Sequence, residues 1–222
     1  MKYDIKKFKT FKYIIRYPTG YVEGNKYPVI LFLHGAGSRG DDIDVLRNNP
    51  FFQITDEYTD FPFITVAPQC SEDTWFDQFG DLKELVLNMP DCIDCDRVYA
   101  MGASMGGYAV WQLAMSLPDV LSAVVPICGG GMYWNARRLV NTNIWAFHGA
   151  DDGVVLARET MEMVKRVNAA GGNAICTIYD NTEHDSWSRT YSNPDVFKWL
   201  LRSKKGGSKT TENKYDNSEL YG

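Results

Sequence analysis

The sequence predicts a single α/β domain, a mostly parallel sheet of about eight strands with helices on both faces, and three observations support this fold class. The 222 residues are enough for one domain with a well-buried core. Apolar residues make up 45% of the chain and charged residues 23%, as in ordinary globular proteins. Short β-branched apolar runs alternate with amphipathic stretches, which is the pattern of parallel strands connected by helices.

The strands are predicted where short apolar runs are bounded by proline, glycine or polar clusters. They are expected at 11–17, 29–33, 63–67, 97–101, 121–127, 143–147 and 174–179. Helices are predicted where apolar residues recur at helical spacing between capping and terminating residues. A short helix reaches about Asn48 after a cap at Asp41 or Asp42, and longer ones are expected at 80–89, 105–116, 156–170 and 194–202.

The chain shows no internal repeat and no shift in composition within its first 202 residues, so we expect residues 1–202 to form one domain. Residues 203–222 are rich in Lys, Ser, Thr, Asn and Gly, and we expect them to be a disordered tail. The spacing between the predicted elements leaves no room for a large helical lid over the sheet.

Charge and composition argue against several classes of partner. The formal net charge of −5 gives no electrostatic attraction to nucleic acid or to an anionic membrane. No apolar run is long enough for a transmembrane helix, and residues 1–10 lack the apolar core of a signal peptide. The five scattered cysteines fit reduced thiols better than a disulfide framework. We therefore expect a cytoplasmic protein.

Gly102-Ala103-Ser104-Met105-Gly106 has the form G-x-S-x-G, with an apolar strand before it and a helix-forming stretch after it. A nucleophilic serine must project from a sharp strand-to-helix turn, and small residues two positions before and after let strand and helix approach closely. The following helix also directs its N-terminal dipole at a developing oxyanion. Ser104 is therefore the candidate nucleophile, and a plain glycine-rich turn is the alternative.

A nucleophilic serine needs a general base, and the chain offers three histidines. His34 and His148 each precede a glycine at the end of an apolar strand, where a structural role in the turn is favoured. His184 lies in a polar loop after the last strand, where a base can reach the serine hydroxyl. We expect His184 to be the base.

The third member should be a carboxylate after the penultimate strand, which gives the chain order Ser, Asp, His. Asp151 and Asp152 both lie in that loop, and Asp152 is favoured because it fits the pattern H-G-x-x-D followed by apolar residues. The alternative is that both carboxylates cap the helix that begins near Leu156. One of them can also cap while the other orients His184.

An oxyanion hole needs two backbone N–H donors, one of them from the residue after the nucleophile. Met105 supplies the first, and Ala36 in the loop after the first buried strand supplies the second, with Gly37 as the neighbouring choice. A phosphate-binding loop is discounted because no Gly-Lys-Ser/Thr follows. We expect neither a cofactor nor a metal ion.

Several aromatic residues lie in or beside the loops that carry these motifs. Trp75, Tyr108, Trp134 and Trp187 are the candidates for substrate binding, together with Gly37. Flat aromatic walls suit a cinnamoyl group or a sugar ring. Packing in the core or at the rim is the alternative for each of the four.

Five motifs occur along the chain in an order that resembles a known group of enzymes. They are Leu33-His34-Gly35-Ala36-Gly37 with Arg39-Gly40-Asp41-Asp42, Ala67-Pro68-Gln69-Cys70 with Trp75, Asp96-Arg97-Val98-Tyr99, Gly102-Ala103-Ser104-Met105-Gly106-Gly107-Tyr108, and Glu183-His184-Asp185-Ser186-Trp187. The group is the small lid-less α/β-hydrolases: feruloyl and acetylxylan esterases, polyhydroxybutyrate-depolymerase-like esterases and sequences described as predicted peptidases. The resemblance spans about 13–201, and it implies an α/β-hydrolase fold and an acyl-enzyme mechanism on Ser104, His184 and Asp152. Leu156 departs from the group, where proline is usual.

The sequence therefore predicts a serine carboxylic-ester hydrolase with a small-molecule ester as its partner. Feruloyl or acetyl-sugar esters are the leading substrates, followed by other short-acyl or aryl esters. A serine peptidase, a thioesterase or a lysophospholipase is the alternative on the same fold. A non-catalytic binding protein is the alternative from another class, and the presence of Ser, His and Asp together argues against it. The oligomeric state is left open.

Overall fold

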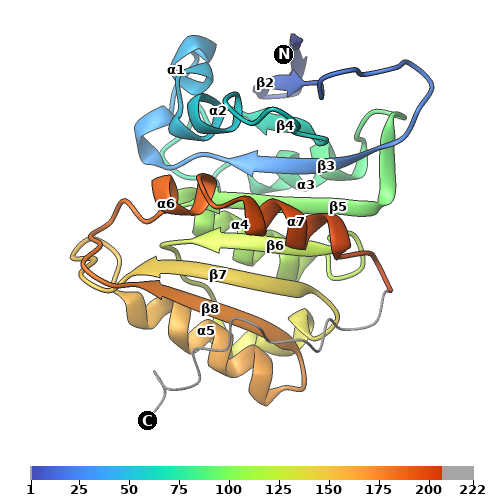
Figure 1. The fold of residues 1–222 in the computed structure, drawn as a ribbon. Coiled ribbons are helices and arrows are strands. Elements are labelled where there is room, and N and C mark those ends of the chain that lie inside the picture. The colour runs from blue at the N-terminus through green and yellow to red at the C-terminus, as the bar shows by residue number, and fades with distance from the viewer. Residues whose placement is uncertain (1, 207–222) are drawn as a thin grey trace.

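The computed structural model describes residues 2–206, and its strands form one eight-stranded sheet (Figure 1). The strands are β1 (Tyr3–Phe8), β2 (Phe11–Arg16), β3 (Tyr27–Leu33), β4 (Ile64–Pro68), β5 (Ile93–Ala103), β6 (Ala123–Ile127), β7 (Asn143–Gly149) and β8 (Asn173–Tyr179). Their order is β1-β2-β4-β3-β5-β6-β7-β8. β2 pairs antiparallel with β1 and β4, and all other pairs are parallel. The prediction of a mostly parallel sheet is confirmed.

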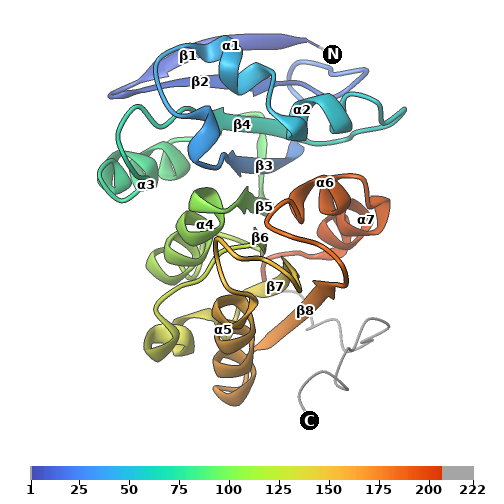
Figure 2. The same cartoon turned by 90° about the vertical axis from the view of Figure 1, so that its left-hand side faces the viewer.

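Helices cover both faces of this sheet, as predicted (Figure 2). They are α1 (Ile43–Arg47), α2 (Pro50–Thr55), α3 (Phe79–Leu87), α4 (Met105–Ser116), α5 (Ala157–Ala169), α6 (Trp187–Tyr191) and α7 (Pro194–Arg202), with short 3₁₀ segments at Ala36–Ser38 and Tyr133–Leu139. The buried side chains of α3, α4 and α5 share one hydrophobic cluster, and those of α1, α2, α6 and α7 share the other. The sheet therefore separates two cores.

Helix ends follow the capping residues closely. The Asp42 side chain accepts a hydrogen bond from the backbone N–H of Asp44 and begins α1. Asn193 accepts from the N–H of Asp195, and the proline that follows it occupies the first turn of α7. The predicted bounds of α4 and α7 agree with the structure residue for residue: α7 begins at an Asn-Pro cap, whereas α4 lacks a capping side chain and lies between the Gly-x-Ser-x-Gly turn and Pro118.

Three elements escape the sequence prediction. β1 is a lysine-rich edge strand with no buried face, so it lacks the alternation that marks a half-buried strand. It forms by antiparallel pairing with β2, with Phe8 opposite Phe11. α2 and α6 are helices of one to two turns that pack against one another, too short for a periodic pattern. β5 also begins earlier than predicted, at Ile93.

Residues 203–205, which follow α7, contact the rest of the domain. Ser203 is buried, its backbone oxygen accepts a hydrogen bond from the Tyr99 hydroxyl, and the N–H of Lys205 donates to Asp96 O. The domain therefore extends past the expected boundary at 202. The predicted tail from 207 to 222 lies outside the described residues.

Two observations bear on the environment of the protein. Among residues 2–206, none of the helices has the length and apolar character needed to cross a bilayer. All five cysteines are free thiols, three of them buried. The cytoplasmic location stays a prediction.

The parallel arrangement places the candidate residues at one edge of the sheet. β3, β5, β6, β7 and β8 run in the same direction, so their carboxyl ends lie together. In open α/β sheets, ligands bind outside these ends. The loops that carry Ala36, Ser104, Asp152 and His184 follow β3, β5, β7 and β8.

Candidate active site

Ser104 occupies a strained turn between β5 and α4. Its φ of 55° and ψ of −119° are dihedrals that residues with a side chain rarely adopt. A Cβ on Gly102 would lie 2.6 Å from Leu33 O, and one on Gly106 would overlap the same oxygen. Only glycine at these two positions allows the close approach of β3, β5 and α4 that holds the turn. The turn projects the serine hydroxyl into an adjacent cavity.

This close approach gives a first testable prediction. Gly106→Ala should lower the free energy of unfolding by about 3 kcal/mol or more, because the new methyl group meets backbone that has no room to move. The measurement is urea denaturation followed by circular dichroism. Gly80→Ala is the matched control, since a Cβ at that position in α3 has no neighbour within 4 Å. Equal stability of the two variants would contradict the packing argument.

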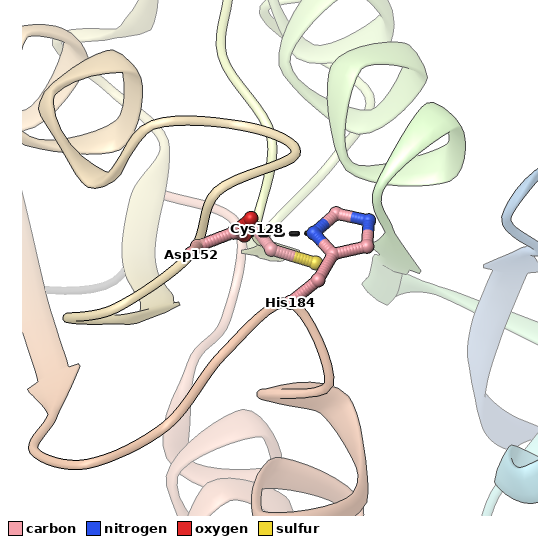
Figure 3. A group of neighbouring side chains, drawn as sticks. All are labelled: Cys128, Asp152 and His184. Atoms are coloured by element: carbon pink, nitrogen blue, oxygen red, sulfur yellow. Dashed lines mark hydrogen bonds and ion pairs between the residues drawn. The ribbon is translucent and has the colours of Figure 1, made fainter.

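The structure brings Ser104, His184 and Asp152 into one hydrogen-bonded line. His184 Nε2 lies 2.9 Å from Ser104 Oγ, and its Nδ1 lies 2.7 Å from Asp152 Oδ2. Figure 3 shows the Asp152–His184 contact between the loops after β7 and β8. Because an ionised carboxylate only accepts, the Nδ1 hydrogen points at Asp152. The Nε2 lone pair therefore faces the serine hydroxyl, as a general base requires.

Both carboxylate oxygens of Asp152 accept hydrogen bonds. Its Oδ1 accepts hydrogen bonds from the backbone N–H groups of Val154 and Val155, each at 2.9 Å. Burial alone would raise the pKa of this carboxyl, but the hydrogen bonds from His184, Val155 and Val154 together lower it below its ordinary value. Asp152 is therefore ionised at neutral pH and stabilises a positive charge on His184.

Asp151 has a different environment. Its side chain is exposed, and its backbone N–H donates to Thr182 O. The geometry thus selects Asp152 from the pair. The N-cap of α5 is Leu156, which makes no side-chain capping bond, and Asp152 accepts instead from the N–H groups of Val154 and Val155, ahead of the helix.

The two predicted oxyanion donors both adjoin the serine. Met105 is the first residue of α4, so its N–H has no acceptor within the helix. On the other side, a Cβ on Gly35 would lie 3.6 Å from Ser104 Cβ, which places the loop that carries Ala36 against the nucleophile. The roles of Ala36 and Met105 as donors stay predictions.

A cavity of about 730 Å³ opens beside the serine hydroxyl. Its lining residues are Gly35, Ala36, Gly37, Ser38, Val45, Asn48, Asn49, Pro50, Ala103, Ser104, Val154, His184, Trp187 and Tyr191. Gly37 and Trp187 are thus placed where the sequence predicts substrate contact. The Trp187 ring stands edge-on to the His184 ring, with centroids 5.3 Å apart.

The structure places the other three predicted aromatic residues away from this cavity. Trp75 is fully buried, and its indole N–H donates to His34 O, so it supports the loop from beneath. Tyr108 belongs to α4, and its ring lies near Gly130 and Glu159. Trp134 is 72% exposed on the 3₁₀ segment, edge-on to Tyr133. These residues are close to the motifs in sequence, but their side chains point elsewhere.

Several cavity residues were not predicted from the sequence. Asn48, Asn49 and Pro50 come from the junction of α1 and α2, and Tyr191 comes from the end of α6. Asn49 followed by Pro50 is a helix-start signal, an N-cap before a proline in the first turn. Tyr191 carries no local signal, since only tertiary packing brings it to the cavity.

The two remaining histidines are both fully buried. His34 Nε2 accepts from the backbone N–H of Cys70, and burial lowers the pKa of His34 to about 4. Burial also lowers the pKa of His148. The structure places His34 beneath the loop of the predicted oxyanion donor, whereas His148 Nε2 lies 3.1 Å from Asp152 Oδ2.

Cys128, Asp152 and His184 form the one group of three possible metal ligands found among residues 2–206 (Figure 3). Two ligands of a tetrahedral zinc ion lie about 3.3 Å apart, whereas the Asp152 and His184 atoms lie 2.7 Å apart with a hydrogen between them. Burial raises the pKa of the Cys128 thiol to about 12, so the thiol is protonated in this hydrogen-bonded arrangement. The group fits a hydrogen-bonded network and not a metal site.

Comparison with known proteins gives several esterases, although no protein-family model matches the chain. Feruloyl esterase D of Neurospora crassa is 28% identical over 159 residues, which are 66% of this chain and 55% of that protein. A solved thermostable esterase is 28% identical with a TM-score of 0.76, covering 91% of this chain and 63% of the other. This chain thus spans less than two thirds of the length of either relative.

Est1E from Butyrivibrio proteoclasticus is similar in fold over nearly its full length. The TM-score is 0.68 at 13% sequence identity, and the match covers 90% of this chain and 98% of the other. At this identity the likeness concerns the fold alone. This chain and these esterases thus share a fold. The turn at Ser104 and the loops after β7 and β8 belong to it.

Proposed function

We propose that this chain, which has the α/β-hydrolase fold of the esterases it resembles, is a serine carboxylic-ester hydrolase. The observation that carries the proposal is the hydrogen-bonded line from Asp152 through His184 to Ser104, at the wall of a cavity. A serine hydroxyl, a correctly oriented imidazole and an ionised carboxylate are the parts that acyl transfer requires. The names of the relatives support an ester as the substrate.

In the proposed mechanism, Ser104 Oγ attacks the ester carbonyl carbon while its proton moves to His184 Nε2. The N–H groups of Met105 and Ala36 stabilise the oxyanion of the tetrahedral intermediate. His184 then gives its proton to the departing alkoxide oxygen, which leaves an acyl group on Ser104. In the second half, His184 takes a proton from water, the hydroxide attacks the acyl carbon, and the same proton returns to Ser104.

The cavity favours an uncharged acyl or alcohol group. Among the described residues that line it, none is Lys, Arg, Asp or Glu. Trp187, Tyr191, Val154 and Pro50 give it apolar and aromatic walls, and its volume suits a molecule of one or two rings. We therefore place feruloyl and related aryl esters first, with acetylated sugars and short-acyl esters next.

The test is an ester panel combined with active-site labelling. Methyl ferulate, acetylated xylan and p-nitrophenyl acetate should be hydrolysed, whereas the matched p-nitroacetanilide, an amide, should react far more slowly. A fluorophosphonate should inactivate the protein with one adduct, which peptide mass spectrometry locates on Ser104. EDTA should leave the rate unchanged. Loss of activity in EDTA with recovery in zinc would overturn the mechanism, and faster cleavage of the amide would indicate a peptidase.

A further inference from the structure

Asp152 contacts two histidines through the same oxygen. Oδ2 lies 2.7 Å from His184 Nδ1 and 3.1 Å from His148 Nε2. His148 belongs to β7 and is fully buried, whereas His184 comes from the loop after β8. The proposed mechanism uses only His184, and it leaves the second buried imidazole on the catalytic carboxylate without a role.

The neighbours of His148 fix the position of its hydrogen. Nε2 faces two acceptors, Val155 O at 2.8 Å and Asp152 Oδ2 at 3.1 Å, so it carries a hydrogen. Nδ1 lies 2.8 Å from Thr160 Oγ1, which in turn lies 2.7 Å from Gly129 O. If the single Thr160 hydrogen points at Nδ1, His148 is neutral; if it points at Gly129 O, Nδ1 carries a second proton. In both states Nε2 carries a hydrogen, which is bonded to Val155 O and lies beside Asp152 Oδ2.

His34 has the opposite arrangement and serves as an internal reference. It also precedes a glycine at a strand end and is fully buried. Its Nε2 accepts from the N–H of Cys70 at 2.9 Å, so its hydrogen lies on Nδ1, which faces Gly35 O at 2.7 Å. Two histidines in the same sequence context thus adopt different tautomers, and of the two only His148 contacts a carboxylate.

We propose that His148 is a positioning residue, whose Nε2–H, bonded to Val155 O, also lies against the Asp152 oxygen that orients the catalytic base His184. The proposal rests on the proposed function. Oδ1 of Asp152 accepts from two backbone N–H groups, and Oδ2 accepts from His184 and has His148 Nε2 at 3.1 Å on its other side. The carboxylate therefore has one orientation, and it presents a fixed acceptor to His184 Nδ1.

His148 also lowers the basicity of the Asp152–His184 pair. An N–H close to an ionised carboxylate favours its charged form, so His148 lowers the attraction of Asp152 for the His184 proton. Removing this N–H strengthens that attraction, so the acidic limb of the pH–activity profile is expected at higher pH. The other titratable groups acting on the network are Tyr108 on α4, Cys128 after β6, Glu159 on α5 and Asp185 before α6. A substitution at 148 leaves all of them in place.

The first experiment uses the unaltered protein and needs no activity. The chain has three histidines, so ¹⁵N-histidine labelling gives three imidazole patterns in two-bond ¹⁵N–¹H correlation spectra. His148 should carry hydrogen on Nε2 from neutral to alkaline pH, and His34 should carry it on Nδ1. An unprotonated Nε2 at His148 would overturn the proposal. The spectrum of His148→Gln, which lacks one pattern, provides the assignment.

The second experiment separates positioning from packing with two variants. His148→Gln keeps an N–H near the position of Nε2, and His148→Leu removes it. The Leu variant should lose about 10- to 100-fold in kcat with KM within about 2-fold. The acidic limb of its kcat/KM profile should move to higher pH by about half to one unit. The Gln variant should keep the wild-type limb and most of the activity.

Phe147→Leu is the control for packing, because Phe147 is buried on the same strand and its ring packs against Trp145 and Tyr179. It should lose stability without moving the limb. An unmoved limb in His148→Leu would overturn the positioning role even if its activity fell. Failure of the wild type to hydrolyse any ester would instead refute the proposed function, while the tautomer of His148 would still be decided by the spectra.

Discussion

Ser104→Ala is expected to lower kcat/KM on p-nitrophenyl acetate by about 10⁴- to 10⁶-fold, while the unfolding midpoint stays nearly unchanged or rises. The hydroxyl is the nucleophile of the proposed mechanism, and its contact with His184 Nε2 is its one described side-chain hydrogen bond. Alanine keeps the β-carbon at the strained dihedrals and leaves the packing of Gly102 and Gly106 intact. Kinetic assays and a thermal melt on the same preparation provide kcat/KM and the unfolding midpoint.

A variant of the same residue tests the strain. Ser104→Gly should be as inactive as the alanine variant but more stable than it by about 1 kcal/mol or more, because glycine adopts a φ of 55° without penalty. Wild-type activity in either variant would end the hypothesis that Ser104 is the nucleophile. Equal melting of the two variants would show that the turn is not strained.

Asp152→Asn should lower kcat by about 10²- to 10⁴-fold, and the structure gives the reason. The carboxylate oxygen Oδ1 accepts two backbone N–H groups, so the amide oxygen of asparagine would take that place. The NH₂ group would then face His184 Nδ1, donor against donor. His184 would change tautomer and turn an N–H toward Ser104, from which it can no longer accept a proton.

Asp151→Asn is the matched control, since Asp151 is exposed, adjacent in sequence and outside the network. It should retain activity within about 3-fold, because an exposed carboxylate with solvent around it contributes little. The reverse order of the two variants would mean that the acid of the triad was assigned to the wrong carboxylate. Steady-state kinetics at one pH on the alkaline plateau are sufficient.

The parts of the site that the sequence predicted are those encoded by short motifs. The turn at Ser104 is specified by glycines two residues away, and the order Ser, Asp, His follows from the strands that precede each residue. The backbone there is decided within the five residues from Gly102 to Gly106, so a local pattern is sufficient. The fold class followed in the same way from the alternation of apolar runs and amphipathic stretches.

The walls of the cavity were harder to predict because they depend on where side chains point after folding. Trp75 and Trp187 lie equally close to motifs in sequence, yet one is buried beneath the His34 loop and the other lines the cavity. The contribution of Tyr191 requires α2 and α6 to pack together, a contact between residues far apart in the chain. No periodicity in either segment indicates that contact.

The glycines around Ser104 also determine how rigid the predicted anion-binding groups are. Gly102 and Gly106 place β5 and α4 directly against Leu33 O, with no side chain between them. Leu33 is followed after two residues by Ala36, and Gly106 is preceded by Met105. The two predicted N–H donors are therefore joined by a short path of touching backbone. The prediction is that this path is already in place when an ester arrives, so that stabilising the oxyanion requires little reorganisation of the protein.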